Sequence, residues 1–357
     1  MRTKTLMFLI TYRCNLRCSY CYEPKIRAPR IDARRLKALV QAKAEAIPDE
    51  YDSFEVHFMG GEPLLEFGMI RETAEWIWTQ DFGKELLTVF APTNGTLLTE
   101  EIKSWCTANR ERFCLGLSFD GDETMQDLNR CASSGQVDLG FFASTWPGQS
   151  VKMTVSPRTV GKLAEGVRFL HSRGFRTVSA DLAQGRDIGW DARALHELSR
   201  QLDILSEHYA GQPDTGCSCS MLDVDIHSAG LNPSAKSCSC GEDLVCIDTD
   251  GREYACHLFS PVALPPEKAR RSLEFDFRDK ASFSNPACNK CMLGRLCTRC
   301  YGMNYITTGD VSRPDPAHCT AFKLIYLANC RHRLRLAKTA GDRRAREQIA
   351  KLINLIS

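Results

Sequence analysis

Short apolar runs and helical repeats of apolar residues alternate along residues 1–205 of the chain. The apolar runs predict strands at residues 6–10, 54–59, 86–91, 113–119, 151–155 and 177–182. The repeats at helical spacing predict helices at residues 31–46, 69–79, 100–109, 163–172 and 192–209. Such alternation is typical of a parallel sheet covered by helices. The pattern therefore predicts an α/β fold.

The composition describes a globular chain rather than a nucleic-acid-binding or membrane protein. Its 357 residues are 43% hydrophobic and 25% charged, with a formal net charge of +2. This length suits one large α/β unit and a smaller one. No apolar run approaches the roughly 20 residues of a membrane span, so we expect a cytoplasmic protein without nucleic-acid or membrane partners. The 18 cysteines then indicate metal or redox chemistry, because disulfides are rare in that compartment.

Three cysteines, Cys14, Cys18 and Cys21, follow the first predicted strand at spacings of three and two residues. Thiolates on a short loop can converge on one four-iron cluster. Three local ligands would leave one iron open for a group that is not protein. A zinc site would require paired Cys or His residues, and a disulfide would leave one thiol over. The ring of Tyr20 could lie flat against a purine.

Polar and glycine residues follow the other predicted strands at their carboxyl ends. Gly60, Gly61 and Glu62 follow the second strand, and residues 93–96 and 118–121 follow the next two. Glycines allow close backbone approach to a ligand, and the Glu62 carboxylate could accept a hydrogen bond from an ammonium group. Carboxyl ends of parallel strands meet at one rim, so we expect a single ligand site there.

The spacing Cys14-x3-Cys18-x2-Cys21, with an aromatic residue before the last cysteine, resembles the signature of radical S-adenosylmethionine (SAM) enzymes. The resemblance implies a partial (β/α)6 TIM-like barrel and a 4Fe-4S cluster whose open iron binds SAM. A flavodoxin- or ferredoxin-type electron donor and a 5′-deoxyadenosyl radical are implied with it. The residues that the resemblance assigns to cofactor binding are Tyr20, Gly60, Gly61, Glu62, Ser118 and Arg130. The last two are carried over from anaerobic sulfatase-maturing enzymes.

A second group of cysteines lies in a Cys-, Gly- and Ser-rich region that begins at Cys217. The series Cys-x2-Cys-x5-Cys-x2-Cys followed by a distal Cys resembles the SPASM extension of radical SAM enzymes, although its last spacing is one residue short. SPASM domains carry two auxiliary 4Fe-4S clusters. The resemblance assigns to the distal cluster Cys288, Cys291, Cys297 and Cys319. It assigns to the proximal cluster Cys240, Cys256 and Cys300. A zinc ribbon is the alternative.

The fourth proximal ligand is predicted from a hairpin over residues 244–256, with Asp250-Gly251 as its two-residue turn. Counting from that turn places Cys256 opposite Val245, so Cys246 should point to the other face. Cys238 is therefore preferred, with Cys246 and open coordination as alternatives.

The expected domains are a radical SAM barrel (1–205), a bridge (206–237), a SPASM domain (238–330) and a C-terminal amphipathic helix (331–357). SPASM enzymes mostly act on peptides or proteins. The leading hypothesis is a maturase that forms a thioether or carbon–carbon cross-link in a ribosomal precursor peptide. Formylglycine formation, peptide epimerisation and a zinc-stabilised adaptor are alternatives. The residue after the hairpin cysteine, His257, stands where sulfatase maturases carry an Asp proposed as base. A leader peptide would be bound by the barrel face, residues 211–237 or a separate protein.

Overall fold

The chain folds into two units, each assembled from separate stretches of sequence. A computed structural model describes residues 1–23, 30–185, 187–212, 215–229, 236–354 and 356. Unit 1 comprises residues 1–118, 133–147 and 239–279, and unit 2 comprises residues 119–132, 148–238 and 280–357. The described ranges omit parts of the expected bridge at 206–237. The boundaries expected at 205, 237 and 330 stay a prediction.

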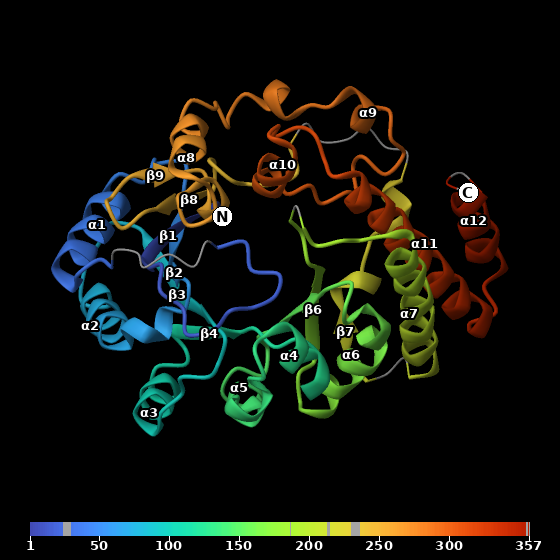
Figure 1. Cartoon of the computed structure of the whole chain (residues 1–357), viewed down its shortest axis with the longest axis horizontal. Helices are drawn as coiled ribbons and strands as arrows, with labels where there is room; N and C mark the ends of the chain where they lie inside the picture. The colour runs from blue at the N-terminus through green and yellow to red at the C-terminus, as the bar shows by residue number, and fades with distance from the viewer. Residues whose placement is uncertain (24–29, 186, 213–214, 230–235, 355, 357) are drawn as a thin grey trace. The chain divides into compact units, whose positions relative to one another are not determined.

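A six-stranded sheet in the order β4-β3-β2-β1-β8-β9 organises unit 1 (Figure 1). Its strands are β1 (Thr3–Thr11), β2 (Ser53–Gly60), β3 (Glu85–Thr93), β4 (Phe113–Leu117), β8 (Leu244–Ile247) and β9 (Glu253–Tyr254). All neighbouring pairs are parallel except β8 and β9. The centre of the sheet is apolar, since Leu6, Val56 and Val89 are almost fully buried.

Helices follow the strands of unit 1 along the chain. They are α1 (Ala33–Glu45), α2 (Phe67–Ile77), α3 (Glu100–Ala108), α5 (Leu139–Thr145) and α8 (Pro266–Ser272). Helix α1 begins where expected because the Asp32 side chain accepts a hydrogen bond from the Arg35 backbone N–H. Trp105 of α3 packs edge-on against Phe113 of β4, with ring centroids 4.9 Å apart. The predicted α/β alternation is confirmed in this unit, whereas α5 and α8 were not predicted.

The hairpin that carries Cys246 has a different register from the predicted one. Cys246 pairs with Tyr254, and the Asp248 N–H donates to the Arg252 carbonyl, which leaves a three-residue loop. Gly251 takes the left-handed conformation that such a loop needs (φ 88°). The prediction that Cys246 points away from Cys256 is therefore wrong, because residues two apart on an extended chain share a face. The hairpin also extends the main sheet, since Met7 of β1 pairs with Cys246.

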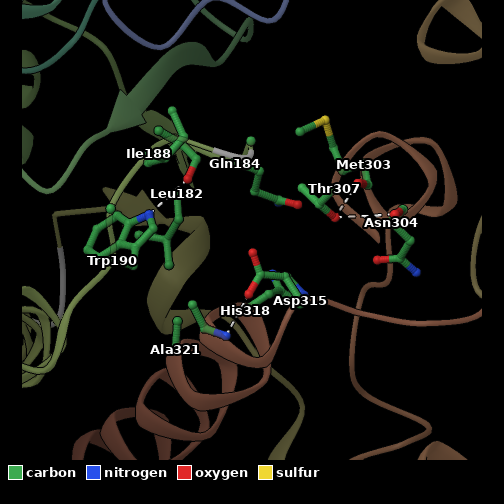
Figure 2. Close-up of a pocket in the computed structure, with 14 residues that line it drawn as sticks. Leu182, Gln184, Ile188, Trp190, Met303, Asn304, Thr307, Asp315, His318 and Ala321 are labelled. Carbon is green, nitrogen blue, oxygen red and sulfur yellow. Dashed lines mark hydrogen bonds between the residues drawn. The ribbon is translucent and has the colours of Figure 1, made fainter. Parts of the chain in front are cut away.

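Unit 2 contains a three-stranded parallel sheet, β5-β6-β7, with helices around it. Its strands are β5 (Val151–Val155), β6 (Thr177–Leu182) and β7 (Ser218–Cys219). Its helices are α4 (Glu123–Asn129), α6 (Leu163–Ser172), α7 (Ala192–Gly211), α9 (Pro286–Asn289), α10 (Tyr301–Thr308), α11 (Pro316–Thr339) and α12 (Arg343–Asn354). A cavity of about 200 Å³ opens where β6 ends, between the following loop and helices α10 and α11 (Figure 2).

The C-terminal segment forms two helices, α11 and α12, rather than one helix from residue 331. Helix α11 begins at Pro316, so Cys330 lies inside it, and the break follows at Gly341 with φ 70°. Ile349 of α12 is buried in a small core together with Phe322 and Tyr326 of α11. Within the described residues, no helix has both the length and the hydrophobicity that a bilayer span requires.

Candidate cofactor and cluster sites

The cysteine loop, residues 12–22, is hydrogen-bonded to the end of β2 through the Gly60-Gly61-Glu62 segment. The N–H of Gly61 donates to the Thr11 carbonyl (3.1 Å), and that of Glu62 donates to the Arg13 carbonyl (2.8 Å). A Cβ at Gly60 would lie 2.2 Å from the Thr11 oxygen, and one at Gly61 would lie 2.5 Å from the Arg13 oxygen. The glycines are therefore required by the approach of the cysteine loop itself. Their contact with a cofactor stays a prediction.

The Glu62 carboxylate is almost fully buried and accepts three hydrogen bonds inside unit 1. One oxygen accepts from the Leu64 N–H (3.0 Å) and the Thr93 hydroxyl (2.8 Å), and the other accepts from the Asn94 N–H (2.7 Å). Hydrogen bonds from N–H groups favour an ionised carboxylate. The resemblance assigns to this carboxylate the contact with the amino group of SAM, which stays a prediction.

Two asparagines connect the loop after β3 to the cysteine loop, and the sequence interpretation did not single them out. Asn94 donates to the side-chain oxygen of Asn15 (2.9 Å), and Asn15 donates to the Thr96 hydroxyl (2.7 Å). Asn15 lies directly after Cys14, so this chain of hydrogen bonds positions the first thiol against the strand-end loop. A polar residue between two cysteines and another at a strand end were the available signals.

The thiols of the cysteine loop lie among acidic groups. The pKa of Cys14 is raised to about 11, mainly by desolvation, with smaller contributions from Glu62, Glu23 and Cys21, whereas the Leu16 N–H opposes the shift. Desolvation and then Glu62 raise the pKa of Glu23 to about 8. The Leu16 N–H points at the Cys14 sulfur (3.5 Å), and the Cys21 N–H closes a turn on the Cys18 carbonyl (3.1 Å). An all-thiol donor set beside carboxylates fits an iron cluster and a cationic ligand, because positive charge there offsets the repulsion.

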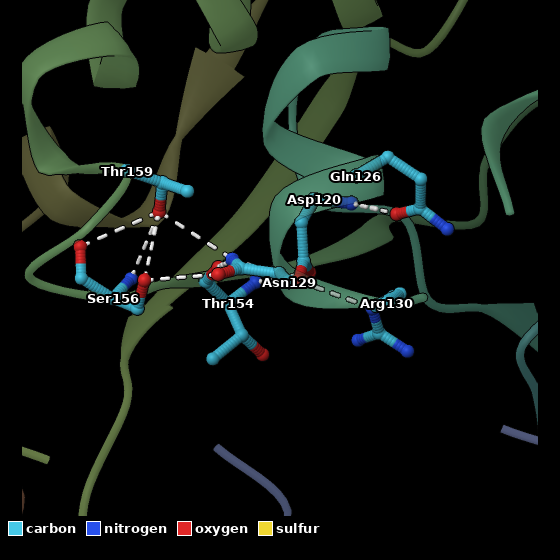
Figure 3. Close-up of polar contacts among 7 residues, drawn as sticks. All are labelled: Asp120, Gln126, Asn129, Arg130, Thr154, Ser156 and Thr159. Atoms are coloured by element: carbon cyan, nitrogen blue, oxygen red, sulfur yellow. Dashed lines mark hydrogen bonds and ion pairs between the residues drawn. The ribbon is translucent and has the colours of Figure 1, made fainter. Parts of the chain in front are cut away.

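Arg130 and Asp120 form a buried ion pair in unit 2 (Figure 3). The Arg130 Nε lies 3.1 Å from Asp120 Oδ2. The other Asp120 oxygen accepts from the Thr154 N–H (2.8 Å), and the Asp120 N–H donates to the Gln126 side chain (2.8 Å). Asp120 therefore holds one edge of the guanidinium. Ser118 closes β4 in unit 1 by donating its N–H to the Thr93 carbonyl. The assignment of Ser118 and Arg130 to SAM stays a prediction.

The four cysteines predicted for the distal cluster lie near one another in unit 2. The pKa of Cys297 is raised to about 12, mainly by desolvation; Cys319, Cys288 and Cys291 contribute to this shift, and Arg299 opposes it. Desolvation likewise raises the pKa of Cys319, with Cys288 and Cys291 next. Tight turns shape the segment, since the Cys291 N–H donates to the Cys288 carbonyl (3.1 Å). Four thiols beside one buried arginine suit an anionic cluster.

The cysteines predicted for the proximal cluster fall into both units. In unit 1, the buried Cys246 interacts electrostatically with Cys256; Cys240 is also buried. In unit 2, desolvation raises the pKa of Cys300, and the nearby Cys238 contributes to the same shift. Among the residues that the structure describes, no three His, Cys, Asp or Glu side chains could hold a single metal ion. A four-iron cluster spreads its thiolates over several irons.

His257 follows Cys256 and faces an aromatic residue of the cysteine loop. The imidazole centroid lies 5.8 Å from the ring of Tyr22. Its Nδ1 is buried without a hydrogen-bond partner in the described part of the chain, and desolvation lowers the His257 pKa to about 4. The side chain is thus a neutral imidazole with an unused nitrogen. Tyr20 on the same loop is half-buried, and its contact with a purine stays a prediction.

Comparisons with known proteins agree with this arrangement. A family model of the radical SAM superfamily matches residues 8–137. A serine-type anaerobic sulfatase-maturating enzyme of Klebsiella pneumoniae is 32% identical over 285 residues, which cover 71% of this chain and 68% of that protein. This relative extends the similarity well beyond the residues that the family model matches.

Solved structures share the fold along most of the chain. Native anSMEcpe with bound AdoMet and the Cp18Cys peptide aligns with a TM-score of 0.69 at 17% identity, covering 99% of this chain and 100% of that one. SuiB of Streptococcus suis bound to the precursor peptide SuiA gives a TM-score of 0.60 at 15% identity, over 88% of this chain and 76% of that one. The family model and the Klebsiella relative together show that this chain belongs to the radical SAM superfamily, whose members bind SAM and a 4Fe-4S cluster.

Proposed function

We propose that this radical SAM enzyme acts on a ribosomally made precursor peptide and closes a thioether or carbon–carbon cross-link in it. Cys14, Cys18 and Cys21 would hold the first cluster, and Glu62 would accept from the SAM amino group. When bound, the cluster and SAM would supply radical chemistry, and these residues would hold and orient them next to the substrate. Two solved proteins of the same fold bind peptides: anSMEcpe binds the Cp18Cys peptide, and SuiB binds the precursor peptide SuiA.

The observation that carries the proposal is the group of four thiols at Cys288, Cys291, Cys297 and Cys319, separate in sequence from the cysteine loop. Cross-linking removes two hydrogens from the peptide. One leaves as a hydrogen atom, and bond formation then releases an electron and a proton. These four thiols would hold an auxiliary cluster, which would supply an electron acceptor. The second auxiliary cluster would use Cys240, Cys256, Cys300 and a fourth ligand. The interaction with Cys300 supports Cys238 in this role, and the interaction with Cys256 supports Cys246.

We assign to His257 the role of accepting the proton that bond formation releases. Its buried Nδ1 has no partner within the described residues, so a substrate proton could be accepted without breaking an existing bond. The ring contact with Tyr22 (5.8 Å) holds the imidazole next to the cysteine loop.

A second candidate is oxidation of a sulfatase Ser or Cys to formylglycine. The 32% identity with the Klebsiella serine-type enzyme favours it. His257 in place of the Asp expected at that position by resemblance counts against it. We further propose a flavodoxin- or ferredoxin-type electron donor and a separate leader-binding protein as partners.

Iron and sulfide analysis of anaerobically reconstituted protein tests the cluster assignment. Three clusters require about twelve irons per chain. A variant lacking the thiols of Cys14, Cys18 and Cys21, and a second lacking those of Cys288, Cys291 and Cys297, should each retain about eight. Zinc with little iron would contradict the enzyme hypothesis and favour a zinc-stabilised adaptor.

Mass spectrometry then separates the reactions. The test peptide is the short Cys-rich product of an open reading frame beside the gene, incubated with SAM and dithionite. A cross-link lowers its mass by two hydrogens and leaves it unreactive toward a hydrazide. Formylglycine from Ser gives the same mass loss but reacts with the hydrazide, and epimerisation leaves the mass unchanged. His257→Gln should lower product formation more than 5′-deoxyadenosine formation, because it removes the proton acceptor and not the radical source.

A further inference from the structure

We propose that the cavity at the end of β6 in unit 2 binds one cationic side chain, lysine or arginine, of the polypeptide substrate. This inference rests on the proposed function in one respect, namely that the substrate is a polypeptide. The cavity begins at Leu182, the last residue of β6, and continues along the loop that follows. Ligands of parallel α/β folds bind beyond the carboxyl ends of strands.

The size of the cavity selects a side chain rather than a cofactor. Its volume is about 200 Å³, compared with about 150 Å³ for an engineered cavity that takes up benzene. Drug-sized ligands need roughly 300 Å³ or more. One extended amino-acid side chain therefore fits, whereas a nucleoside does not.

The walls are apolar and largely preformed. Leu182, Ile188 and Trp190 form one side, and Met303 of α10 faces them across the cavity (Figure 2). The indole N–H of Trp190 donates to the Ala183 carbonyl (2.8 Å). This bond fixes the indole against Ala183 and leaves the ring itself as cavity wall. An aliphatic stem can lie along these walls, and an aromatic face also attracts a cation.

The polar groups favour positive charge. The Asp315 carboxylate points into the middle of the cavity, near the side chain of Gln184 (Figure 2). One Asp315 oxygen caps α11 by accepting from the Ala317 N–H (2.8 Å), and no cation of the described residues pairs with it. Among the described lining residues, Asp315 is the only Asp, Glu, Lys or Arg side chain.

An iron cluster held by the four distal thiols would add negative charge next to this cavity. The His318 Nε2 lies 4.0 Å from the Cys297 sulfur, and the next residue, Cys319, belongs to the same group of four thiols. Thiolate-bound clusters are anionic, and charges in a partly desolvated site interact more strongly than in water. A lysine or arginine side chain would therefore be attracted, and an acidic side chain would be repelled.

Small capped amino acids test the site without knowledge of the substrate. Nα-acetyl-lysine methylamide should bind the oxidised holoenzyme in saturation-transfer NMR with a dissociation constant on the order of 1 mM, the range for a fragment of this size. The norleucine analogue, which keeps the stem and lacks the ammonium group, should bind about fivefold more weakly.

Two variants and one matched control complete the test. Asp315→Asn keeps an oxygen that can cap α11 but removes the charge, so it should weaken the lysine probe about fivefold and leave the norleucine probe unchanged. Ala321→Leu fills the cavity and should block both probes. Asp191→Asn is the control, because Asp191 caps α7 through the Ala194 N–H (2.8 Å) and does not line the cavity.

The outcomes separate this inference from the proposed function. Equal affinity for the two probes, absence of binding, or equal weakening by Asp191→Asn would overturn the cationic pocket. Unchanged binding in Ala321→Leu would place the probe elsewhere and also overturn it. Iron content measured on the same samples tests the clusters independently. Full iron without lysine binding overturns the pocket alone, whereas lysine binding by an iron-free protein supports the pocket and refutes the enzyme.

Discussion

Glu62→Gln is the sharpest test of the strand-end site, because Gln keeps the shape of the side chain and changes only its charge and one oxygen. The two Glu62 oxygens accept three hydrogen bonds of 2.7–3.0 Å. An amide nitrogen in place of either oxygen would face a donor. The amide nitrogen should take the position of the oxygen that accepts only from the Asn94 N–H, because the other oxygen accepts from both the Leu64 N–H and the Thr93 hydroxyl. We therefore expect the Asn94 N–H to lose a hydrogen bond to a charged acceptor, worth about 1.5–3 kcal/mol.

Hydrogen–deuterium exchange measures this loss locally. A cost of about 1.5–3 kcal/mol makes local opening about 10- to 150-fold more frequent, so exchange of the Asn94 amide should accelerate by that factor. Peptides covering residues 60–66 and 92–97 report it by mass spectrometry. Glu72→Gln is the control, since Glu72 is exposed and pairs with Lys37 (2.8 Å), an interaction worth less than about 1 kcal/mol. Exchange within about twofold of the wild type in Glu62→Gln would refute the reasoning.

Three further substitutions probe other parts of the molecule. Gly61→Ala puts a Cβ 2.5 Å from a carbonyl of the cysteine loop; iron analysis should show the loss of about four irons, whereas Gly68→Ala, with open space around its Cβ, should retain them all. Asp120→Asn leaves the buried Arg130 without its charge partner and should cost about 3–5 kcal/mol, read from the urea midpoint; an unchanged midpoint contradicts the pairing. Ile349→Ala should weaken docking of α12 by about 2–5 kcal/mol, measured as faster amide exchange in that helix but not in α1.

Most of the fold could be predicted because its signals are local. Apolar runs identified β1 to β6, and the Asp32 cap identified where α1 begins, whereas the short strand β7 was not predicted. The pairing of β8 with β1 could not be predicted, because it joins residues far apart in the sequence. The hairpin register failed for a different reason. Asp250-Gly251 is compatible with a two-residue turn and with a three-residue loop that places Gly251 last, and these differ by one residue in pairing.

The chemistry of the candidate site was predictable from the sequence, but the contacts that hold its residues in place were not. The thiol spacing and the position of Glu62 after a strand follow from the sequence. The need for glycine at position 61 does not follow from the sequence, since it depends on the Arg13 carbonyl oxygen of the cysteine loop. The Asn15–Asn94 bond likewise links two loops that are 79 positions apart, and an isolated asparagine carries no signal of such a partner.

The parallel pairing of β8 with β1 has a consequence for biosynthesis. One edge of β1 is covered by β2, but the other edge has its partner only after residues 244–247 have been made. At roughly 5–20 residues per second, that interval is on the order of 10–50 s. During this time the nascent chain carries an open strand edge, which invites pairing with other chains. The cysteine loop continues directly from this strand, so the first iron site can take its final shape only after the hairpin that carries Cys246 has left the ribosome.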